Sequence, residues 1–300
     1  MATPSTSYTK EDVRAGFIAA FAAYTIWGLL PLYLMLVSFA DPREILGQRI
    51  IWAAPACLIG IFAISGWRRG LSELRGAMRP ALIATLALSA VFIFINWAIY
   101  VWAVANERVI SAALAYFLAP LVQVAVGVGF YGEKLSRWQI AALALAGIGV
   151  IVQGVALGAF PWVSLALCAT WCAYGVVRKR AVVPAATGLF IETAILLPVA
   201  AGLLYWVGAA TLRFDDSMGY GALLALAGPA TAIPLTLFAF GARRLSFTTI
   251  GLLQFIAPTI QFLIGVIAGE PLTALRIASF GFIWAGLALF SYDVWRRERG

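Results

Sequence analysis

VISAALAYFLAPLVQVAVGVGFYGEKLSRWQ, at residues 109–139, consists of an apolar run with Pro120 near its middle, a short connector that contains Gly-Glu, and the start of another run. A related stretch, TIGLLQFIAPTIQFLIGVIAGEPLTALR, occupies residues 249–276 and carries Pro258 at the matching position. The alignment of the two prolines also matches Gln123 with Gln261, and GEKLS at 132–136 with GEPLT at 269–273 after a one-residue slip. Self-similarity of this kind indicates that two halves of the chain share one architecture.

The composition defines the class of protein. Of the 300 residues, 63% are hydrophobic and 11% are charged, whereas a soluble domain carries about a quarter charged residues. Apolar runs of about 20 residues, long enough to cross a bilayer, recur along the chain. Because a segment in lipid must satisfy its own backbone polar groups, and no barrel-like alternation is present, these runs are predicted to be helices. The sequence therefore predicts an all-α membrane protein with the lipid bilayer as its partner.

Ten transmembrane helices are predicted, in two inverted five-helix repeats. The expected spans are 15–37, 44–65, 80–104, 109–131, 137–157, 160–178, 186–208, 218–241, 247–268 and 272–293. The connectors between them are read as short. The chain is divided accordingly into a cytoplasmic tail at 1–14, a first repeat at 15–157, a second repeat at 158–293 and a basic tail at 294–300.

The basic residues predict the orientation. Lys and Arg gather in alternate connectors, around 68–79, 134–137, 178–180 and 243–244, and in both tails. An excess of Lys and Arg marks cytoplasmic loops, so both termini are predicted to be cytoplasmic. The net charge of +8 is thereby explained by short loops, and no nucleic-acid partner is expected.

An odd number of spans in each half inserts the second copy upside down. The alignment extends to Trp27 with Trp171 and to Arg49 with Glu192. An inverted repeat about an axis in the membrane plane is the architecture that lets a transporter exchange outward- and inward-facing states. This feature is the strongest functional indication in the sequence.

Several segments carry a family resemblance. The repeated P-x-x-Q and GE-x-L-[ST] motifs, in ten spans, resemble the EamA-type transporters of the drug/metabolite transporter superfamily. WGLLPLY at 27–33, EILGQRIIW at 44–52, NWAIYVWAV at 96–104 and GLFIET at 188–193 look like RarD-type permeases. The resemblance covers residues from about 16 to 297. It implies a multi-pass permease of the bacterial inner membrane, often an exporter, with a central cavity between the halves.

Two ionisable residues within spans are functional candidates, because a charge there usually faces a water-filled cavity or a partner. Arg49 is expected near the outer end of its span and Glu192 near the inner end, so no direct pair between them is expected. Both are read as substrate-binding candidates, and Glu192 also as a proton-coupling group. The competing interpretation is that Arg49 snorkels toward Asp41 or Glu44, and Glu192 toward residues 178–180.

Amides and aromatic rings gather near the expected mid-depth of the membrane. Such a mixture suits a cavity for a small, partly apolar solute. The competing interpretation is hydrogen bonding between helices for the amides, worth about 0.6 kcal/mol each, and packing for the rings. The remaining substrate-binding candidates are Trp27, Asn96, Tyr100, Gln123, Trp171, Gln254 and Gln261.

Prolines and small residues suggest how the helices bend and pack. Pro120 and Pro258 are read as gating hinges, with fixed bends as the competing account. Small residues four apart in spans five and ten, Ala142/Ala146 and Gly281/Ala285, let helices approach closely. They predict packing within the protomer or a homodimer through spans five and ten.

The sequence offers nothing for catalysis. It contains no His, no Walker motif and no Ser–His arrangement, so no enzyme, metal or cofactor is expected. Cys57, Cys168 and Cys172 lie in apolar runs and are read as packing residues. The predicted function is secondary-type transport by alternating access of a small organic solute, such as a drug-like compound, an amino acid or a related metabolite. The rival interpretations are a non-transporting sensor or assembly component and an uncoupled facilitator.

Overall fold

A computed structural model describes residues 9–106, 108–155, 162–208, 218–267 and 274–299, and these residues form helices and connectors without a strand. The first half contains α1 (Lys10–Leu36), α2 (Pro42–Ser65), α3 (Trp67–Ala77), α4 (Pro80–Ala105), α5 (Val109–Tyr131) and α6 (Arg137–Val155). The second half contains α7 (Trp162–Arg180), α8 (Ala185–Trp206), α9 (Met218–Ala225), α10 (Ala227–Ala242), α11 (Phe247–Leu253), α12 (Ile256–Ile267) and α13 (Ala274–Arg299). The second GE motif, at 269–273, and the expected boundary between the repeats, at 157–158, lie outside the described residues.

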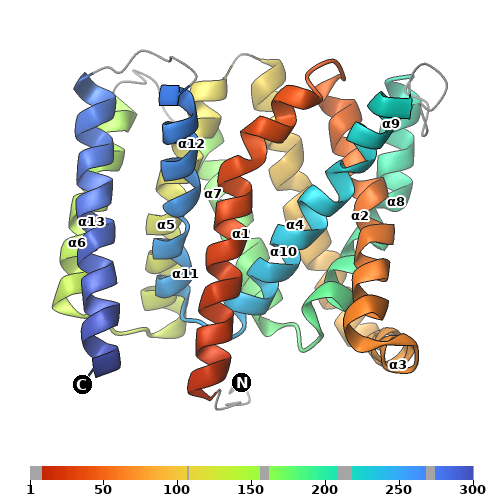
Figure 1. Cartoon of the computed structure of the whole chain (residues 1–300), viewed down its shortest axis with the longest axis horizontal. Coiled ribbons are helices and arrows are strands. Elements are labelled where there is room, and N and C mark those ends of the chain that lie inside the picture. The colour runs from red at the N-terminus through yellow and green to blue at the C-terminus, as the bar shows by residue number, and fades with distance from the viewer. Residues whose placement is uncertain (1–8, 107, 156–161, 209–217, 268–273, 300) are drawn as a thin grey trace.

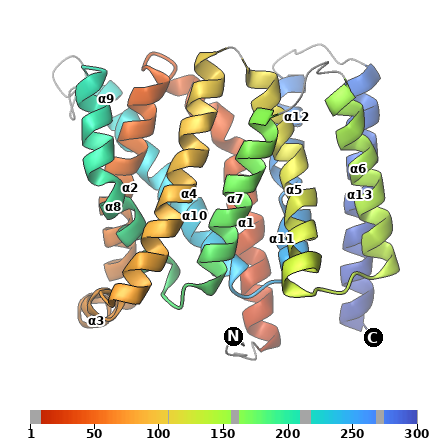
Figure 2. The same cartoon turned by 180° about the vertical axis from the view of Figure 1, so that it is seen from behind.

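The helices form one bundle in which most axes run between two opposite ends (Figure 1). The described ends of the chain both lie at the same end of this bundle, which we call the termini end; the other is the far end. α6 and α13 pair at one edge, and α2 packs against α8 toward the opposite edge, as the reverse view also shows (Figure 2). Between these edges α1 packs on α10 and α12, while α7 packs on α4 and α5.

Seven helical segments are long and apolar enough to cross a membrane within the described residues. They are Lys10–Leu36, Pro42–Ser65, Pro80–Ala103, Leu114–Tyr131, Ala185–Trp206, Gly219–Ala242 and Phe247–Ile267. Shorter apolar stretches occupy Arg137–Val152 and Ile277–Asp293. Together with the absence of strands from the described residues, these segments establish an all-α membrane protein.

The first helix begins earlier than the sequence predicts. Thr9 caps α1 by accepting a hydrogen bond from the Asp12 amide at 3.1 Å, and the Asp12 carboxylate accepts from the Thr9 amide at 3.1 Å. This reciprocal arrangement is a capping box, which satisfies amides that a helix start otherwise leaves unpaired. Residues 10–14, expected in the tail, are therefore helical.

Among the described residues, the helix α3 was not predicted from the sequence. The connector after α2 is not a short loop, since it holds α3, which lies at the termini end beside α2 with its axis crosswise to the long helices (Figure 1). Gly66 makes the turn before α3 possible, because its φ of 72° lies in the left-handed region that favours glycine. Gly70 then lets α3 approach Phe62, whose Cδ1 would lie 2.9 Å from an added Cβ.

Two expected spans each divide into two consecutive helices, although the backbone at Leu226 and Gln254 stays in the right-handed helical region. The eighth is divided into α9 and α10 around Leu226, and the ninth into α11 and α12 around Gln254 and Phe255. Pro258 explains the second break, because proline removes one helical hydrogen bond and its ring clashes with the carbonyl four residues earlier, here Gln254. Pro120, by contrast, lies inside the continuous helix α5. The two matched prolines therefore differ in their local effect.

Candidate functional site

An internal cavity of about 310 Å³ opens among α1, α2, α4, α5, α7, α10 and α12. It extends toward the far end, where Leu34 near the end of α1 and Pro42 at the start of α2 both line it. Its volume is at the lower end of the range of about 300–1,000 Å³ typical of small-molecule pockets. The lining residues are Tyr24, Trp27, Leu30, Leu34, Pro42, Ile45, Leu46, Arg49, Asn96, Trp97, Tyr100, Val101, Ala115, Tyr116, Ala119, Leu167, Cys168, Trp171, Leu235, Gln254, Ala257 and Gln261.

Aromatic rings form one wall of the cavity. Trp27 and Trp171, the residues matched between the two halves, meet edge to face with ring centroids 5.3 Å apart. Tyr24 lies 5.6 Å from Trp27, and Phe238 lies 4.9 Å from Trp171, again between centroids. Such pairs stabilise one another by packing and ring electrostatics.

The predicted amides use their NH₂ groups to join helices. Asn96 Nδ2 donates to the Leu167 carbonyl at 2.8 Å and to Thr170 Oγ1 at 2.9 Å. Gln261 Nε2 donates to the Trp27 carbonyl at 3.2 Å. The amide oxygens of Asn96 and Gln261 receive no hydrogen bond from a described residue, so they can accept one from a ligand. Each of these two amides therefore joins helices and also lines the cavity.

Gln254 lies at the break between α11 and α12 and accepts a hydrogen bond from Trp171 Nε1 at 3.2 Å. This amide lines the cavity beside the aromatic wall. Trp171 is thereby fixed by a polar contact as well as by packing. Its indole nitrogen has a partner, as the polar group of a buried tryptophan usually does.

Arg49 provides the positive charge of the cavity. Its Nε donates to Thr231 Oγ1 at 3.0 Å, and its guanidinium carbon lies 4.8 Å from the centre of the Trp97 ring. Asp41 is engaged elsewhere: it pairs with Arg43 at 2.9 Å, and this hydrogen bonding holds the pKa of the Asp41 carboxyl below its usual range. The interpretation in which Arg49 snorkels outward is therefore wrong for Asp41, because Arg49 extends inward to α10.

Glu192 lies outside the cavity lining, in a buried polar cluster that joins α4, α7 and α8. Arg178 Nε lies 3.5 Å from Glu192 Oε1, and both side chains are 1% exposed. At this distance the contact is an ion pair without a hydrogen bond, and Arg178 Nη2 donates instead to the Ala185 carbonyl at 3.1 Å. Ser89 Oγ donates to Glu192 Oε1, and Tyr174 Oη donates to Oε2 at 3.4 Å.

This cluster partly matches the competing interpretation of Glu192. The partner is Arg178, as that interpretation expects, but the pair is buried and does not reach the membrane surface. Sequence reasoning missed Ser89 and Tyr174 as partners. The only signal for Tyr174 is its position one helical turn before Arg178.

Gln123, the counterpart of Gln261, also lies outside the lining. It is fully buried, and neither its Nε2 nor its Oε1 finds a hydrogen-bond partner among the described residues. Its Cβ would be 3.2 Å from a Cβ added at Gly251, which places it against α11. Burying an amide without hydrogen-bond partners costs free energy, so this arrangement of the helices is unfavourable for the Gln123 side chain.

At the termini end, charged side chains bind backbone atoms of neighbouring segments. Glu133, from the first GE motif, accepts from the Phe247 amide at 2.7 Å and from the Thr248 amide at 2.9 Å, and so caps α11. Lys179 donates to the carbonyls of Ala242 and Leu245, and Arg243 donates to that of Val183. This role of Glu133 was not predicted from the sequence, although the repeated Gly-Glu motif pointed to an important residue at this position.

The three cysteines are buried, and Pro120 lies at a close contact between helices. Cys57, Cys168 and Cys172 are buried free thiols, which agrees with a packing role, and Cys168 also lines the cavity. Among the described residues no group of three or more His, Cys, Asp or Glu side chains could hold a metal ion. An added Cβ at Gly251 would lie 2.8 Å from the Pro120 carbonyl, so α11 touches α5 at Pro120.

Comparisons with known proteins agree with this architecture. Residues 14–154 match the EamA-like transporter family. The chain is 39% identical over 289 residues to "Uncharacterized transporter YojE" of Bacillus subtilis (strain 168), covering 95% of this chain and 97% of that protein. It is 38% identical over 293 residues to "Protein RarD" of Escherichia coli (strain K12), covering 96% and 98%. A solved structure superposes with a TM-score of 0.71 at 21% identity, covering 95% of this chain and 99% of the other, which shows a shared fold.

Apolar helices in a multi-pass bundle, and relatives named as transporters over nearly their full length, define this protein as a membrane transporter. The chain belongs to the EamA-like transporter family, as a RarD-type permease.

Proposed function

We propose that this permease moves a small organic solute across the bacterial inner membrane by alternating access. The main support for this proposal is the internal cavity and its lining. The cavity is lined by rings and amides, it extends toward the far end, and charged side chains bind backbone atoms of neighbouring segments at the termini end. A solute would enter from the far end, bind beside the aromatic wall and leave when the termini end opens.

The pattern of helix contacts supports ten spans in two inverted repeats. If α1 corresponds to α7, α4 to α10 and α5 to α12, then the pairing of α1 with α10 corresponds to that of α7 with α4. The pairing of α1 with α12 likewise corresponds to that of α7 with α5. α2 packs on its own counterpart α8, and α6 on its counterpart α13. A two-fold related contact pattern is what an inverted repeat requires.

Gln123 and Gln261 supply a second line of support. They are matched in the sequence, yet Gln261 lines the cavity while Gln123 is buried without a partner. In a symmetric transporter the two halves exchange conformations, so matched residues exchange surroundings. We propose that Gln123 faces the cavity, and gains partners, when the termini end is open.

The orientation follows from charge. The termini end carries the basic connectors, so we propose that it faces the cytoplasm and that the state described here faces outward. The Arg178–Glu192 pair lies between the cavity and the termini end, since Arg178 belongs to the last turn of α7. We assign it the role of an inner lock that proton binding to Glu192 would release. In this view Glu192 couples transport to protons without contacting the solute.

The test is solute flux in proteoliposomes under an imposed proton gradient. A thermal-shift screen with organic acids, amino acids, nucleosides and amphenicol-type drugs supplies the solute, because a ligand at 100 times its Kd stabilises a fold by about 2.7 kcal/mol. Flux that depends on the gradient in the natural protein and is gradient-independent in Glu192→Gln supports coupling. Concentrative uptake unchanged by Glu192→Gln would remove Glu192 as the coupling group. Correct insertion with no flux of any ligand would instead favour a non-transporting sensor or assembly role.

The small residues of α13 favour a homodimer. Ala142 and Ala146 of α6 are buried within the protomer. They pack against α13, where an added Cβ at Gly286 would lie 2.7 Å from the Ala142 carbonyl. Gly281 and Ala285 of α13 are exposed instead. We propose that they form the dimer contact, and Gly281→Leu should shift the protein to monomers in light-scattering measurements of the purified protein.

A further inference from the structure

The charge content of the cavity is unbalanced. Arg49 places a positive charge on the cavity wall, and the lining residues include no Asp or Glu. No ion pair joins Arg49 to a carboxylate in the described part of the chain. Its polar neighbours in the lining include the neutral phenols of Tyr100 and Tyr116. A partly buried positive charge without a counter-charge is unfavourable, so the cavity favours an anion.

The hydrogen bonds of Arg49 leave donors for that anion. Nε is taken by Thr231 at 3.0 Å, while the two Nη nitrogens have no hydrogen-bond partner among the described residues. The Trp97 ring, 4.8 Å away, holds the guanidinium by a cation–π contact. A planar guanidinium with its two outer nitrogens available matches the two oxygens of a carboxylate.

The rest of the lining limits the ligand further. A single cation balances a single negative charge. The rings of Trp27, Trp97 and Trp171 offer stacking surface to a flat apolar body. The amide oxygens of Asn96 and Gln261 can accept hydrogen bonds from a hydroxyl or amine, but no carboxylate is present to balance an ammonium group. The cavity therefore disfavours organic cations. For a zwitterion, the ammonium group would find only neutral hydrogen-bond acceptors in the lining.

Resting on the proposed transport function, we infer that the substrate is an organic monoanion, a carboxylate on a ring-sized apolar body, whose charged end binds Arg49. The carboxylate lies against the Nη nitrogens and the body lies against the aromatic wall. Arg49 is the residue that selects for the charge.

Equilibrium binding to the purified protein tests this assignment without requiring transport. The probes are phenylacetate, its neutral counterpart phenylacetamide, and the cation phenethylamine, followed by tryptophan fluorescence and thermal shift. Phenylacetate should bind at least about tenfold more tightly than phenylacetamide. A hydrogen bond between charged groups contributes about 1.5 kcal/mol or more beyond one to a neutral group, and this difference corresponds to about tenfold in Kd. Phenethylamine should bind least. Tighter binding of the amide or amine, or no binding by any of the three, overturns the inference.

Variants locate the charge that discriminates. Arg49→Gln should lower the affinity for phenylacetate to that for the amide, whereas Arg14→Gln, which removes an exposed arginine at the termini end, should leave the ranking unchanged. Arg49→Lys keeps the charge and should keep the preference for the anion, so the test survives if Arg49→Gln does not fold. Unchanged discrimination in a folded Arg49→Gln protein contradicts the inference. Anion binding without flux would contradict the transport function alone, and flux of neutral solutes without anion preference would contradict this inference alone.

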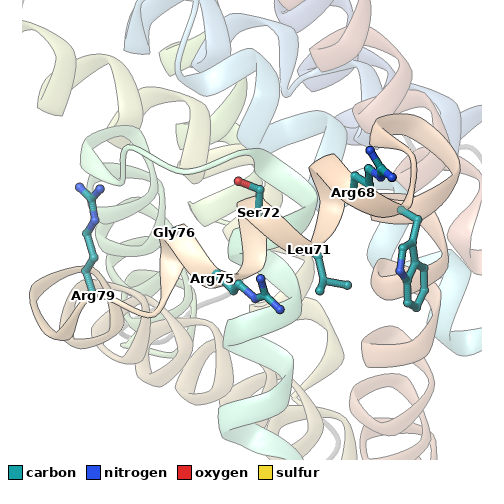
Figure 3. A pocket seen from close by; sticks show the side chains of 7 residues that line it. Arg68, Leu71, Ser72, Arg75, Gly76 and Arg79 are labelled. Carbon is teal, nitrogen blue, oxygen red and sulfur yellow. The ribbon is translucent and has the colours of Figure 1, made fainter.

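A separate surface, on α3, has an independent feature. Figure 3 shows a recess along this helix at the termini end, lined by Trp67, Arg68, Leu71, Ser72, Arg75, Gly76 and Arg79. Arg68 and Arg75 are seven residues apart in the helix, so they lie on one face, and Arg79 follows just after the helix ends. None of these three arginines forms an ion pair with a carboxylate among the described residues.

The opposite side of α3 is held against the bundle. Glu73 accepts from Ser65 Oγ at 2.9 Å and from Thr187 Oγ1 at 3.3 Å. The arginine face is therefore kept turned outward. Apolar side chains flank it: Ile64 is 81% exposed and Trp67 is 68% exposed. A helix with a basic face, a tryptophan and apolar neighbours at a membrane boundary is typical of one that lies in the lipid headgroup layer.

We propose that the α3 face binds the phosphate groups of anionic phospholipids in the leaflet at the termini end. Arginine pairs with phosphate through two parallel hydrogen bonds, and Arg68, Arg75 and Arg79 present three such groups around one recess. Ile64 and Trp67 would enter the acyl boundary beside the bound headgroup. The site anchors the end of the molecule that opens in the proposed cycle.

Native mass spectrometry of the protein in detergent with phosphatidylglycerol or phosphatidylcholine tests this site. The natural protein should retain phosphatidylglycerol in preference, and the triple variant Arg68→Gln/Arg75→Gln/Arg79→Gln should bind it about a hundredfold more weakly. The control Lys10→Gln/Arg14→Gln/Lys134→Gln removes the same charge from exposed residues near that end. Equal losses in both triple variants, retention in the α3 variant, or equal binding of the two lipids would overturn the proposal.

Discussion

Arg178 Nε lies 3.5 Å from Glu192 Oε1, with both side chains 1% exposed, and this pair joins the last turn of α7 to α8. Breaking such a pair from one side leaves a buried charge without compensation, which costs about 3–5 kcal/mol. Arg178→Met should therefore destabilise the protein by that order, as measured by denaturant unfolding in detergent micelles. Adding Glu192→Leu should recover much of the loss, because neither charge then remains. Additive losses in the double variant would show that the two residues act independently.

The cap on α11 gives a prediction about local order. Glu133→Ala removes the acceptor of the Phe247 and Thr248 amides, and a lost N-terminal cap costs about 0.5–2 kcal/mol. Hydrogen exchange should accelerate at these amides, while α6 and α13 exchange as before. Glu133→Gln keeps one acceptor oxygen and should have a smaller effect. Unchanged exchange at 247–248 in the alanine variant would contradict the cap.

Close helix approach can be tested with two glycines. A Cβ added at Gly228 in α10 would lie 2.3 Å from the carbonyl carbon of Trp52, a backbone atom of α2 that cannot rotate away. Gly228→Ala should separate the two helices and destabilise the protein by roughly 1–3 kcal/mol. Gly147 in α6 has no atom within 4 Å of an added Cβ, so Gly147→Ala should be neutral or stabilising by up to about 1 kcal/mol. The thermal midpoints of the two variants should move in different directions.

Arg49 carries the prediction about transport. Arg49→Ala removes the charged contact of the cavity with no change at the membrane surface, so flux should fall by about tenfold or more at normal membrane levels. Arg43→Ala removes the nearby exposed arginine of the Asp41 pair and should leave flux intact. Size-exclusion profiles of both variants check their folding. Full flux in Arg49→Ala would mean that this arginine has a structural role.

Much of the site could be predicted from the sequence. Trp27, Trp171, Arg49, Asn96, Tyr100, Gln254 and Gln261 all line the cavity, as expected from polar and aromatic residues near mid-depth. Depth follows from counting along a helix, because each residue advances about 1.5 Å. The helical class and the position of most spans follow from apolar length in the same direct way.

Glu192 and Gln123 show where such reasoning stops. Both were expected at the cavity, and both are buried elsewhere, because depth does not define which way a helix is rotated about its axis. The rotation depends on packing between distant segments, such as Ser89 of α4 and Arg178 of α7 meeting Glu192. The breaks near Leu226 and Gln254 were missed for a related reason. A proline in a span shows that a hydrogen bond is lost, but the neighbours decide whether the helix bends or breaks.

The central claim is that one cavity is reached alternately from the two sides of the membrane. Gln261→Cys, in a protein whose Cys57, Cys168 and Cys172 are replaced by alanine, reports on it directly. A charged, membrane-impermeant thiol reagent is applied to right-side-out and to inside-out vesicles, and the rate of labelling is measured with and without a transported solute. We predict labelling from both sides, with the solute changing the ratio of the two rates. Labelling from one side only, with or without solute, would contradict alternating access.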